Sequence, residues 1–392
     1  MVLYSRVFSP PGKSFFLFGP RGTGKSTLIR MLFQDALWVD LLKPDVFRTY
    51  LARPERLLEL TQAHSSHQPV VIDEIQKVPA LLTVVHHLIE SSPGRQFILT
   101  GSSARKIKRS GADLLAGRAL NCSLHPFMAC EMGADFNLRK ALTQGMLPVI
   151  QNDKQPQRTL QSYVELYLRE EIQAEGLVRH LDSFARFMEV ISFSHASLLN
   201  ISNIARECQV KRKTVENYIQ ILEDLLLAFT LPVFTKRAQR ETVSHPKFYL
   251  FDTGVYQTLR PRGQLDSPEE IGGAAIEGLV AQHLLAWKAY SMEPVQLFYW
   301  RTRAGLEVDF IIYDERGLYA VEVKHHTRVD RHDLKSLHAF KTDYPMAQCL
   351  LLYQGTEKVL IEGVLCLPCE DFLRQLEPDK PVWGSVSPQL RE

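Results

Sequence analysis

The sequence predicts an α/β protein built from more than one domain. At 392 residues the chain is longer than one hydrophobic core usually supports, so we expect two or three domains. Short apolar runs alternate with helical stretches up to about residue 125, which indicates a parallel sheet wrapped by helices. The middle of the chain keeps a helical period, and strand-like runs return after Pro246.

The apolar runs define the expected elements in order. In the first part we predict strands at 15–18, 36–42, 69–73, 96–100 and 119–124, and then helical structure through about residue 235. In the last part we predict strands at 297–301, 307–313, 318–324 and 348–353, with a helix near 332–341. The Gly/Pro-rich segment 254–273 is the best boundary. We therefore expect domains at 1–150, 151–253 and 254–392.

A phosphate-binding loop of the G-x-x-x-x-G-K-[ST] type follows the first predicted strand and precedes a predicted helix. The glycines let backbone N–H groups point inward around an anion, and the helix N-terminus adds a partial positive charge. Lys25 is expected to reach the β- and γ-phosphates, and Ser26 to hold Mg²⁺. The residues expected to contact the nucleotide are Gly19, Pro20, Arg21, Gly22, Thr23, Gly24, Lys25, Ser26 and Thr27. The chain is therefore predicted to bind a nucleoside triphosphate, ATP, with Mg²⁺.

The predicted strand at 69–73 ends in two carboxylates, Asp73 and Glu74, about fifty residues after the loop. Asp73 is expected to hold Mg²⁺ through water, opposite Ser26. Glu74 is expected to orient and deprotonate the attacking water, because hydrolysis requires both tasks. This spacing predicts an ATP hydrolase.

Two further segments offer groups for the same reaction. The strand at 96–100 is followed by small polar residues, and a hydroxyl of Thr100, Ser102 or Ser103 can contact the γ-phosphate or the water, or simply close a turn. Arg118 follows a glycine turn and is a candidate arginine finger, in cis or toward a neighbouring subunit, or else a surface arginine. A finger acting in trans would require a homo-oligomer.

The composition is that of an ordinary soluble globular protein, with 45% apolar and 23% charged residues. The net charge of +2 neither demands nor excludes a nucleic-acid partner. No apolar run approaches the ~18 residues of a membrane span, and the first residues lack the apolar core of a signal peptide. We therefore expect a cytoplasmic protein without a membrane partner.

A second candidate site lies near the end of the chain. Asp309 is followed by Glu322 and Lys324, and strand alternation puts the last two on one face. This D…[DE]-x-K pattern is typical of a large nuclease superfamily, although any charged hairpin can produce it. Asp309 and Glu322 would hold a divalent metal, Lys324 would position the water or stabilise charge, and Glu277 would add a carboxylate from a preceding helix. The pattern raises the hypothesis of a metal-dependent nuclease site.

Residues 197–226 indicate a helix-turn-helix, with a turn at Gln209-Val210 and the second helix beginning near Thr214. Lys211, Arg212 and Lys213 fall at the start of the expected recognition helix, and Lys236, Arg237 and Arg240 in a following wing. DNA is therefore a candidate partner. The alternative is a winged-helix module used as a lid or as a surface for a protein partner.

The motifs together resemble a large prokaryotic group of predicted AAA+-type ATPases. The matching residues are Gly19–Ser26, Val70–Glu74 with Gln76-Lys-Val-Pro79, Leu99–Ser103, Leu115–Arg118, Lys247–Gly254, Tyr299–Arg301, Glu307–Asp309 and Glu322–Lys324. The resemblance implies a P-loop ATPase domain, then a winged-helix module, and then a small α/β domain of restriction-endonuclease type whose function is uncharacterised. Two functions follow: an ATP-driven enzyme that acts on nucleic acid and carries a nuclease site, or a nucleotide-dependent switch or scaffold whose last two domains only bind partners.

Overall fold

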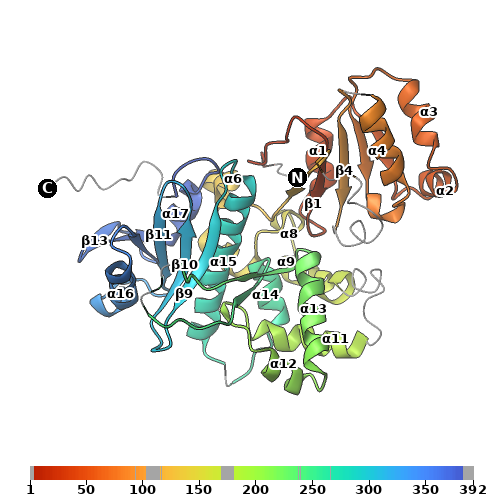
Figure 1. Cartoon of the computed structure of the whole chain (residues 1–392). Helices are drawn as coiled ribbons and strands as arrows, with labels where there is room; N and C mark the ends of the chain where they lie inside the picture. Colours follow the sequence, from red (N-terminus) through yellow and green to blue (C-terminus); the bar gives the residue numbers. More distant parts are fainter. Residues whose placement is uncertain are drawn as a thin grey trace. The chain divides into compact units, whose positions relative to one another are not determined.

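The computed structural model describes residues 4–92, 94–102, 115, 117–168, 181–236, 238, 240–264 and 266–382 (Figure 1). Contacts within the chain divide it into two compact units. One unit comprises residues 8–125 with 223–226, and the other comprises residues 1–7, 126–222 and 227–392. Each unit is described by itself below.

The first unit contains a parallel sheet of five strands in the order β2-β3-β4-β1-β5. The strands are β1 (Phe15–Phe18), β2 (Leu37–Asp40), β3 (Val70–Asp73), β4 (Phe97–Gly101) and β5 (Leu120–Ser123). Strand β4 lies between β1 and β3, with Leu17 paired with Thr100. The carboxyl ends of β1, β4 and β3 therefore lie side by side at one edge of the sheet.

Helices cover both faces of this sheet. They are α1 (Lys25–Leu32), α2 (Pro44–Ala52), α3 (Arg56–Gln62) and α4 (Leu81–Ser91), with a 3₁₀ turn η1 (Ile75–Lys77) after β3. Alternate strand residues such as Phe16, Ile72 and Leu99 form one buried cluster with side chains of α2, α3 and α4. The strand residues between them are buried on the other face, which is the period-2 pattern of a sheet covered on both sides.

The second unit begins with short helices. They are α6 (Ala129–Met132), η3 (Gly133–Asp135), α7 (Leu138–Gln144), α8 (Pro148–Gln151), α9 (Pro156–Ser162) and the π-helical turn η4 (Tyr163–Leu168). Helix α7 and the turn after it are bonded to later parts of the same unit. The Met146 N–H donates to Asp252 (2.7 Å), and the Leu138 N–H donates to Glu370 (3.1 Å). These bonds explain why residues 126–150, which the sequence suggested as part of the first domain, belong to the second unit.

A three-stranded antiparallel sheet in the order β6-β8-β7 follows in the second unit. The elements run α11 (Leu181–Ser192), β6 (Ser197–Leu198), α12 (Ile201–Glu207), α13 (Arg212–Asp224), β7 (Ala228–Leu231) and β8 (Lys247–Leu250). Asn200 caps α12 by accepting from the Asn203 N–H, and Gln209 takes a left-handed conformation between α12 and α13. The tight connection therefore lies where the sequence predicted a turn.

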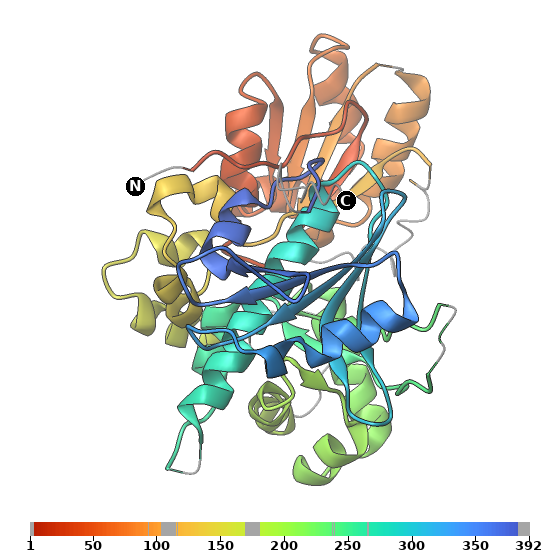
Figure 2. The same cartoon turned by 90° about the vertical axis from the view of Figure 1, so that its left-hand side faces the viewer.

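The rest of the second unit is a six-stranded mixed sheet in the order β13-β14-β12-β11-β10-β9. Its strands are β9 (Gln296–Arg301), β10 (Glu307–Tyr313), β11 (Leu318–Val323), β12 (Gln348–Tyr353), β13 (Val359–Ile361) and β14 (Val364–Pro368). Its helices are α14 (Thr253–Leu259), α15 (Pro268–Tyr290), η5 (Arg331–Leu334), α16 (Lys335–Asp343) and α17 (Cys369–Gln375). Figure 2 shows the long helix α15 running beside this sheet, which it contacts at β9.

Each predicted strand is observed, with ends within one or two residues of the prediction. Five observed strands were not predicted, namely β6, β7, β8, β13 and β14, and β7 lies in a segment that was predicted to be helical. The Gly/Pro-rich segment 254–273 is largely helical, because Asp252 caps α14 and Ser267 with Pro268 begins α15. The domain limits at 150 and 253 stay a prediction. Among the described residues, no helix is long and apolar enough to cross a bilayer.

Candidate functional site

The loop between β1 and α1 has the backbone of a phosphate cradle. Gly22 and Gly24 have φ values of 83° and 85°. Residues that carry a side chain rarely adopt such positive φ values, whereas glycine does so readily. A Cβ on Gly19 would lie 2.4 Å from the Leu124 carbonyl oxygen, so only glycine fits there. The three glycines therefore shape the loop for different physical reasons.

Polar side chains hold the loop together. The Lys25 ammonium donates to the carbonyls of Gly19 (2.6 Å) and Pro20 (3.1 Å), so it lies inside the loop. The buried Thr23 hydroxyl donates to the same Pro20 carbonyl at 2.8 Å. Ser26 is half-buried at the start of α1, while Arg21 and Thr27 are exposed. A loop shaped by glycines, with a lysine side chain inside it, fits a bound triphosphate.

Asp73 is the last residue of β3 and Glu74 follows it, at the edge of the sheet where the loop lies. Asp73 is buried, and the Thr100 hydroxyl donates a short hydrogen bond to its carboxylate. The same hydroxyl accepts from the Glu74 N–H at 3.3 Å. Thr100 thus joins both acidic residues from the strand between β3 and β1. A carboxylate here with the Ser26 hydroxyl provides the hard oxygen donors that Mg²⁺ prefers.

Glu74 is held in an uncommon geometry. Its φ of 60° places a non-glycine residue in the left-handed region, which costs energy and clusters at functional sites. The Gln76 amide donates to the Glu74 carboxylate and also to the Ser102 hydroxyl (3.2 Å). Gln76 belongs to one of the family motifs in the sequence, but its contact with Glu74 was not predicted. Ser103, the other predicted hydroxyl, lies outside the described residues.

Arg118 lies away from the loop within the first unit. It precedes β5, whose first residue Leu120 pairs with Phe15, the first residue of β1. The loop follows the last residue of β1, so Arg118 is at the opposite edge of the sheet. Its guanidinium bonds Glu90 near the end of α4 and lowers the pKa of that carboxyl. This position argues against a role in cis, and a finger acting in trans stays a prediction.

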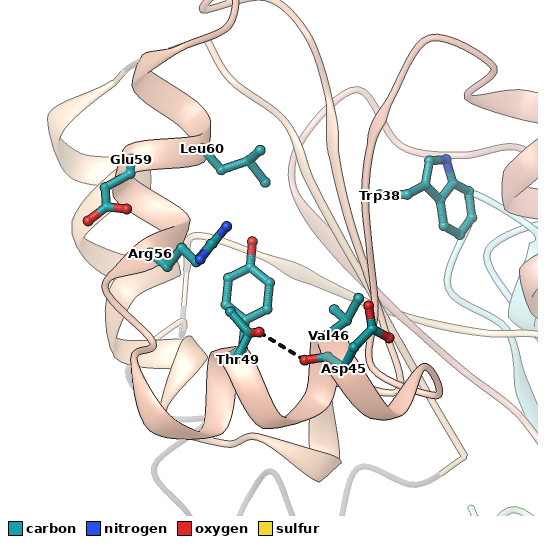
Figure 3. A pocket seen from close by; sticks show the side chains of 8 residues that line it. Trp38, Asp45, Val46, Thr49, Arg56, Glu59 and Leu60 are labelled. Carbon is teal, nitrogen blue, oxygen red and sulfur yellow. Dashed lines mark hydrogen bonds between the residues drawn. The ribbon is translucent and has the colours of Figure 1, made fainter.

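A surface pocket of about 390 Å³ lies over α2, α3 and β2 (Figure 3). Trp38 and Tyr50 are its aromatic residues, and Asp45, Arg56 and Glu59 bring charge. Strand β2 is separated from β1 by β4 and β3. The pocket is therefore distinct from the phosphate cradle.

In the second unit, the predicted C-terminal residues gather around a lysine for which the sequence suggested no role. Lys247, on β8, is buried, and its ammonium lies 2.8 Å from Glu277 Oε1 and 3.0 Å from Asp309 Oδ1. Glu307 Oε1 lies 2.5 Å from the same nitrogen. We call Lys247, Glu277, Glu307, Asp309, Glu322 and Lys324 the C-terminal cluster.

Asp309 connects the cluster to the next strand. Phe310 of β10 pairs with Val321 of β11, so the register carried one residue further sets Asp309 opposite Glu322. The Val323 N–H donates to Asp309 Oδ2 at 2.9 Å, and the Lys324 ammonium donates to Glu322 Oε1 at 2.7 Å. An irregularity in β10 spans Asp309. The structure therefore brings Asp309, Glu322 and Lys324 close to one another.

The pKa values of the cluster reflect the close approach of its buried charges. Burial, followed by the charge of Asp309, raises the pKa of Glu277 to about 8 and the pKa of Glu322 well above its ordinary value. Burial opposes the charge of Lys247, but the neighbouring acidic groups, Glu277 first, raise its pKa well above its ordinary value. Lys247 is therefore the charged centre of the cluster.

The C-terminal cluster does not fit the shared metal ion that the sequence predicted for Glu277, Asp309 and Glu322. Across the described parts of the chain, no group of three His, Cys, Asp or Glu side chains is arranged to hold a metal ion. The physical reason is that the Lys247 ammonium already lies between the carboxylates.

The basic residues of the middle segment fall into two groups. Lys211, Arg212 and Lys213 are exposed at the start of α13, as predicted. The wing residues are engaged within the second unit instead: Arg240 bonds Asp343 at 2.8 Å, and Lys236 lies over the Tyr313 ring. Arg237 lies outside the described residues.

Comparison with protein families gives three consecutive matches. Residues 12–133 match a family described as AAA domain, residues 135–266 match a domain of unknown function (DUF8612), and residues 272–372 match another (DUF4143). With the parallel sheet and phosphate cradle, the first match defines the N-terminal part of the chain as an AAA-type P-loop domain. The chain therefore contains a nucleotide-binding domain of the AAA type.

Curated relatives include uncharacterized proteins of Mycobacterium bovis and Mycobacterium tuberculosis. Each is 27% identical over 369 residues, covering 91% of this chain and 80% of the relative. Among solved structures, the replication initiator DnaA bound to AMPPCP and single-stranded DNA is 12% identical and has a TM-score of 0.27, covering 54% of this chain and 82% of DnaA. A DNA polymerase III gamma subunit-related protein of Thermotoga maritima is 11% identical, with a TM-score of 0.24, and covers 55% and 93%. TM-scores this low do not establish a shared fold.

Proposed function

We propose that the chain is a Mg²⁺-dependent ATPase that acts on nucleic acid. The observation that best supports hydrolysis is the pair Asp73 and Glu74, joined through Thr100 at the edge of the sheet that carries the phosphate cradle. A binding module needs only the cradle, whereas a second, correctly placed carboxylate serves the chemistry of water attack.

The residues divide the work as follows. Backbone N–H groups of the loop and the Lys25 ammonium bind the phosphates and neutralise charge. Ser26 and Asp73 are the residues that would hold Mg²⁺, Asp73 through water. Glu74, oriented by Gln76, takes a proton from the attacking water. Mg²⁺, when bound, supplies charge stabilisation at the phosphates.

ATP hydrolysis by three purified proteins tests this assignment: the wild type, Lys25→Ala and Glu74→Gln. Lys25→Ala is expected to lose tight ATP binding. Glu74→Gln is expected to bind ATP like the wild type but to lose about 10²-fold or more in turnover, because water activation is lost while the cradle remains. The exposed Lys13→Ala and Glu55→Gln are the matched controls. Undiminished turnover by Glu74→Gln would remove that residue from the mechanism.

Action on nucleic acid is supported by the middle of the chain. The order α11, β6, α12, α13 and a β7–β8 hairpin with one antiparallel sheet is the order expected of a winged helix. Three exposed cations stand at the start of α13, where recognition helices contact DNA. A DNA-stimulated ATPase rate is the expected readout.

A second candidate function is a nucleotide-dependent switch or scaffold whose later domains only bind partners. The last part of the chain has the order of elements expected of a nuclease-like domain: helix α15, strands β9–β11, helix α16 and strand β12. The position of Lys247 favours binding over cutting, however, because its ammonium lies among the acidic groups that a nuclease would use for metal. Incubation with Mg²⁺ or Mn²⁺ and a panel of DNA and RNA tests whether the last part of the chain cuts nucleic acid. Stimulation of ATP hydrolysis by the same nucleic acids distinguishes the two functions.

A further inference from the structure

The C-terminal cluster contains its own cation. Lys247 belongs to β8, whereas its partners come from α15 (Glu277) and β10 (Glu307 and Asp309). The lysine side chain is only 2% exposed, so its ammonium exchanges no hydrogen bonds with bulk water. Three carboxylates surround a nitrogen that has three N–H donors, and each carboxylate can accept one.

The three carboxylates also have partners from the protein other than Lys247. Glu277 Oε1 accepts from the Tyr249 hydroxyl at 2.6 Å as well as from Lys247. Asp309 Oδ2 accepts from the Val323 N–H. Glu307 Oε2 lies 2.6 Å from an Arg301 nitrogen. Donors from the protein thus hold the carboxylates in place through hydrogen bonds and ion pairs.

A metal ion and this ammonium would compete for the same oxygens. A divalent cation requires oxygen ligands at roughly 2.0–2.6 Å, and Lys247 Nζ already lies at 2.8 and 3.0 Å from Glu277 Oε1 and Asp309 Oδ1. Removing the lysine would leave buried acidic groups without their counter-ion, which is strongly unfavourable. Glu322 Oε2 is buried and has no hydrogen-bond partner among the described residues, so one ligand position would still be unused.

We propose that the Lys247 ammonium takes the place of the divalent metal in the C-terminal cluster, so that the cluster binds no metal ion and cleaves no phosphodiester bond. The lysine also ties the β7–β8 hairpin to the six-stranded sheet, because it connects β8 with α15 and β10.

Titration with Mn²⁺ in the absence of nucleotide tests this proposal on the full chain. The wild type and Asp309→Asn are expected to give the same binding isotherm, because the cluster contributes no site. Lys247→Met, which keeps the length of the side chain without its charge, is expected to gain one Mn²⁺ site per chain. Adding Asp309→Asn to that variant should weaken the new site at least about 10–100-fold. The Mn²⁺ isotherm of Asp73→Asn shows how much of the bound metal lies near the phosphate cradle, and this amount is subtracted from the other isotherms.

Three results would overturn the proposal. The first is Mn²⁺ binding by the wild type that Asp309→Asn removes, since a metal would then coexist with the lysine. The second is a folded Lys247→Met chain that gains no site. If Lys247→Met fails to fold, the comparison of wild type with Asp309→Asn still decides the question, together with cleavage assays on the wild type in Mn²⁺. Cleavage that Asp309→Asn abolishes would also refute it, independently of ATP hydrolysis.

Discussion

The Gln76 side-chain amide donates a hydrogen bond to the Glu74 carboxylate and a second one to the Ser102 hydroxyl. Its oxygen is buried without a hydrogen-bond partner among the described residues, and a Cβ on Gly101 would lie 2.6 Å from that oxygen. Gln76 is thus packed in one orientation. It fixes the direction of the carboxylate that we expect to activate water.

Gln76→Ala is therefore expected to lower kcat by about 10- to 100-fold, a part of the ~10²–10⁴-fold that a positioned general base contributes. The ATP dissociation constant is expected to stay close to that of the wild type, because Gln76 is not part of the phosphate cradle. Steady-state kinetics with equilibrium ATP binding separates the two effects, and the exposed Gln62→Ala is the control. Equal losses in binding and turnover would point to a structural role instead.

Gly19→Ala is expected to weaken ATP binding and to destabilise the first unit by about 1–3 kcal/mol, because the added methyl overlaps the Leu124 carbonyl. Chemical denaturation with an ATP-binding titration measures both. Gly12→Ala is the matched control, since a Cβ there meets nothing within 4 Å. Normal nucleotide affinity in Gly19→Ala would show that the loop tolerates the overlap.

Arg118→Ala is expected to leave ATP binding unchanged and to lower turnover only under conditions in which chains associate. The reason is its place at the sheet edge opposite the phosphate cradle, beside Glu90. Specific activity measured across a range of protein concentrations tests this, with Glu90→Gln controlling for loss of the ion pair. A rate independent of concentration and equal in wild type and Arg118→Ala would end the finger hypothesis.

Lys211→Ala combined with Arg212→Ala is expected to weaken binding of the full chain to duplex DNA and to reduce the salt dependence of the affinity. For every side chain that binds a phosphate in the wild type, its removal should lower the slope of log K against log salt by about 0.9. Arg139→Ala with Lys140→Ala removes the same charge from the exposed surface of α7 and is the matched control. An equal effect of both pairs would mean that only net charge matters.

His283 makes stability depend on pH. It is buried on α15, where its Nδ1 lies 2.8 Å from the Leu279 carbonyl oxygen and its Nε2 accepts from the Ala129 N–H at 2.9 Å. The neutral ring with a proton on Nδ1 satisfies both bonds, and a proton on Nε2 would face the Ala129 N–H. Burial lowers the pKa of His283 from 6.5 to about 4.

The folded pKa is lower than the unfolded one, so the unfolded chain binds the extra proton between pH 6.5 and 4. The stability contribution is therefore present above pH 6.5 and is lost as the pH falls toward 4, with a magnitude on the order of 3 kcal/mol. His283→Gln, which keeps an acceptor for Ala129, is expected to flatten the dependence of the unfolding free energy on pH in this window. The surface substitution His338→Gln should retain the dependence of the wild type.

The parts of the molecule that depend on neighbouring residues along the chain could be predicted from the sequence. The strands follow from short apolar runs, and the phosphate cradle from glycines that permit φ values of 83° and 85° within a few residues of Lys25. Asp73 ends a buried strand and Glu74 follows it, and the carboxyl ends of parallel strands meet at one edge. These features need only local backbone chemistry and the geometry of a parallel sheet.

The sequence also placed Asp309, Glu322 and Lys324 together, because hairpin pairing brings neighbouring strands into register. It provided no means of knowing that Lys247, 62 residues before Asp309, would lie among them. That contact requires β8 and α15 to pack beside β10. Once Lys247 is buried there, the carboxylates next to it become its ion-pair partners. A buried ammonium must have acidic neighbours, but which ones is set by how distant elements pack.

The sequence by itself therefore determined the AAA-type nucleotide cradle and the identities of its charged residues. Only the tertiary structure decided what surrounds those charges. It set Arg118 at the sheet edge opposite the loop, joined Gln76 to Glu74, and filled the C-terminal cluster with Lys247. The backbone conformation of a residue depends on its own type and on its few neighbours in the sequence. The partner of a buried charge depends instead on how elements far apart in the chain pack together.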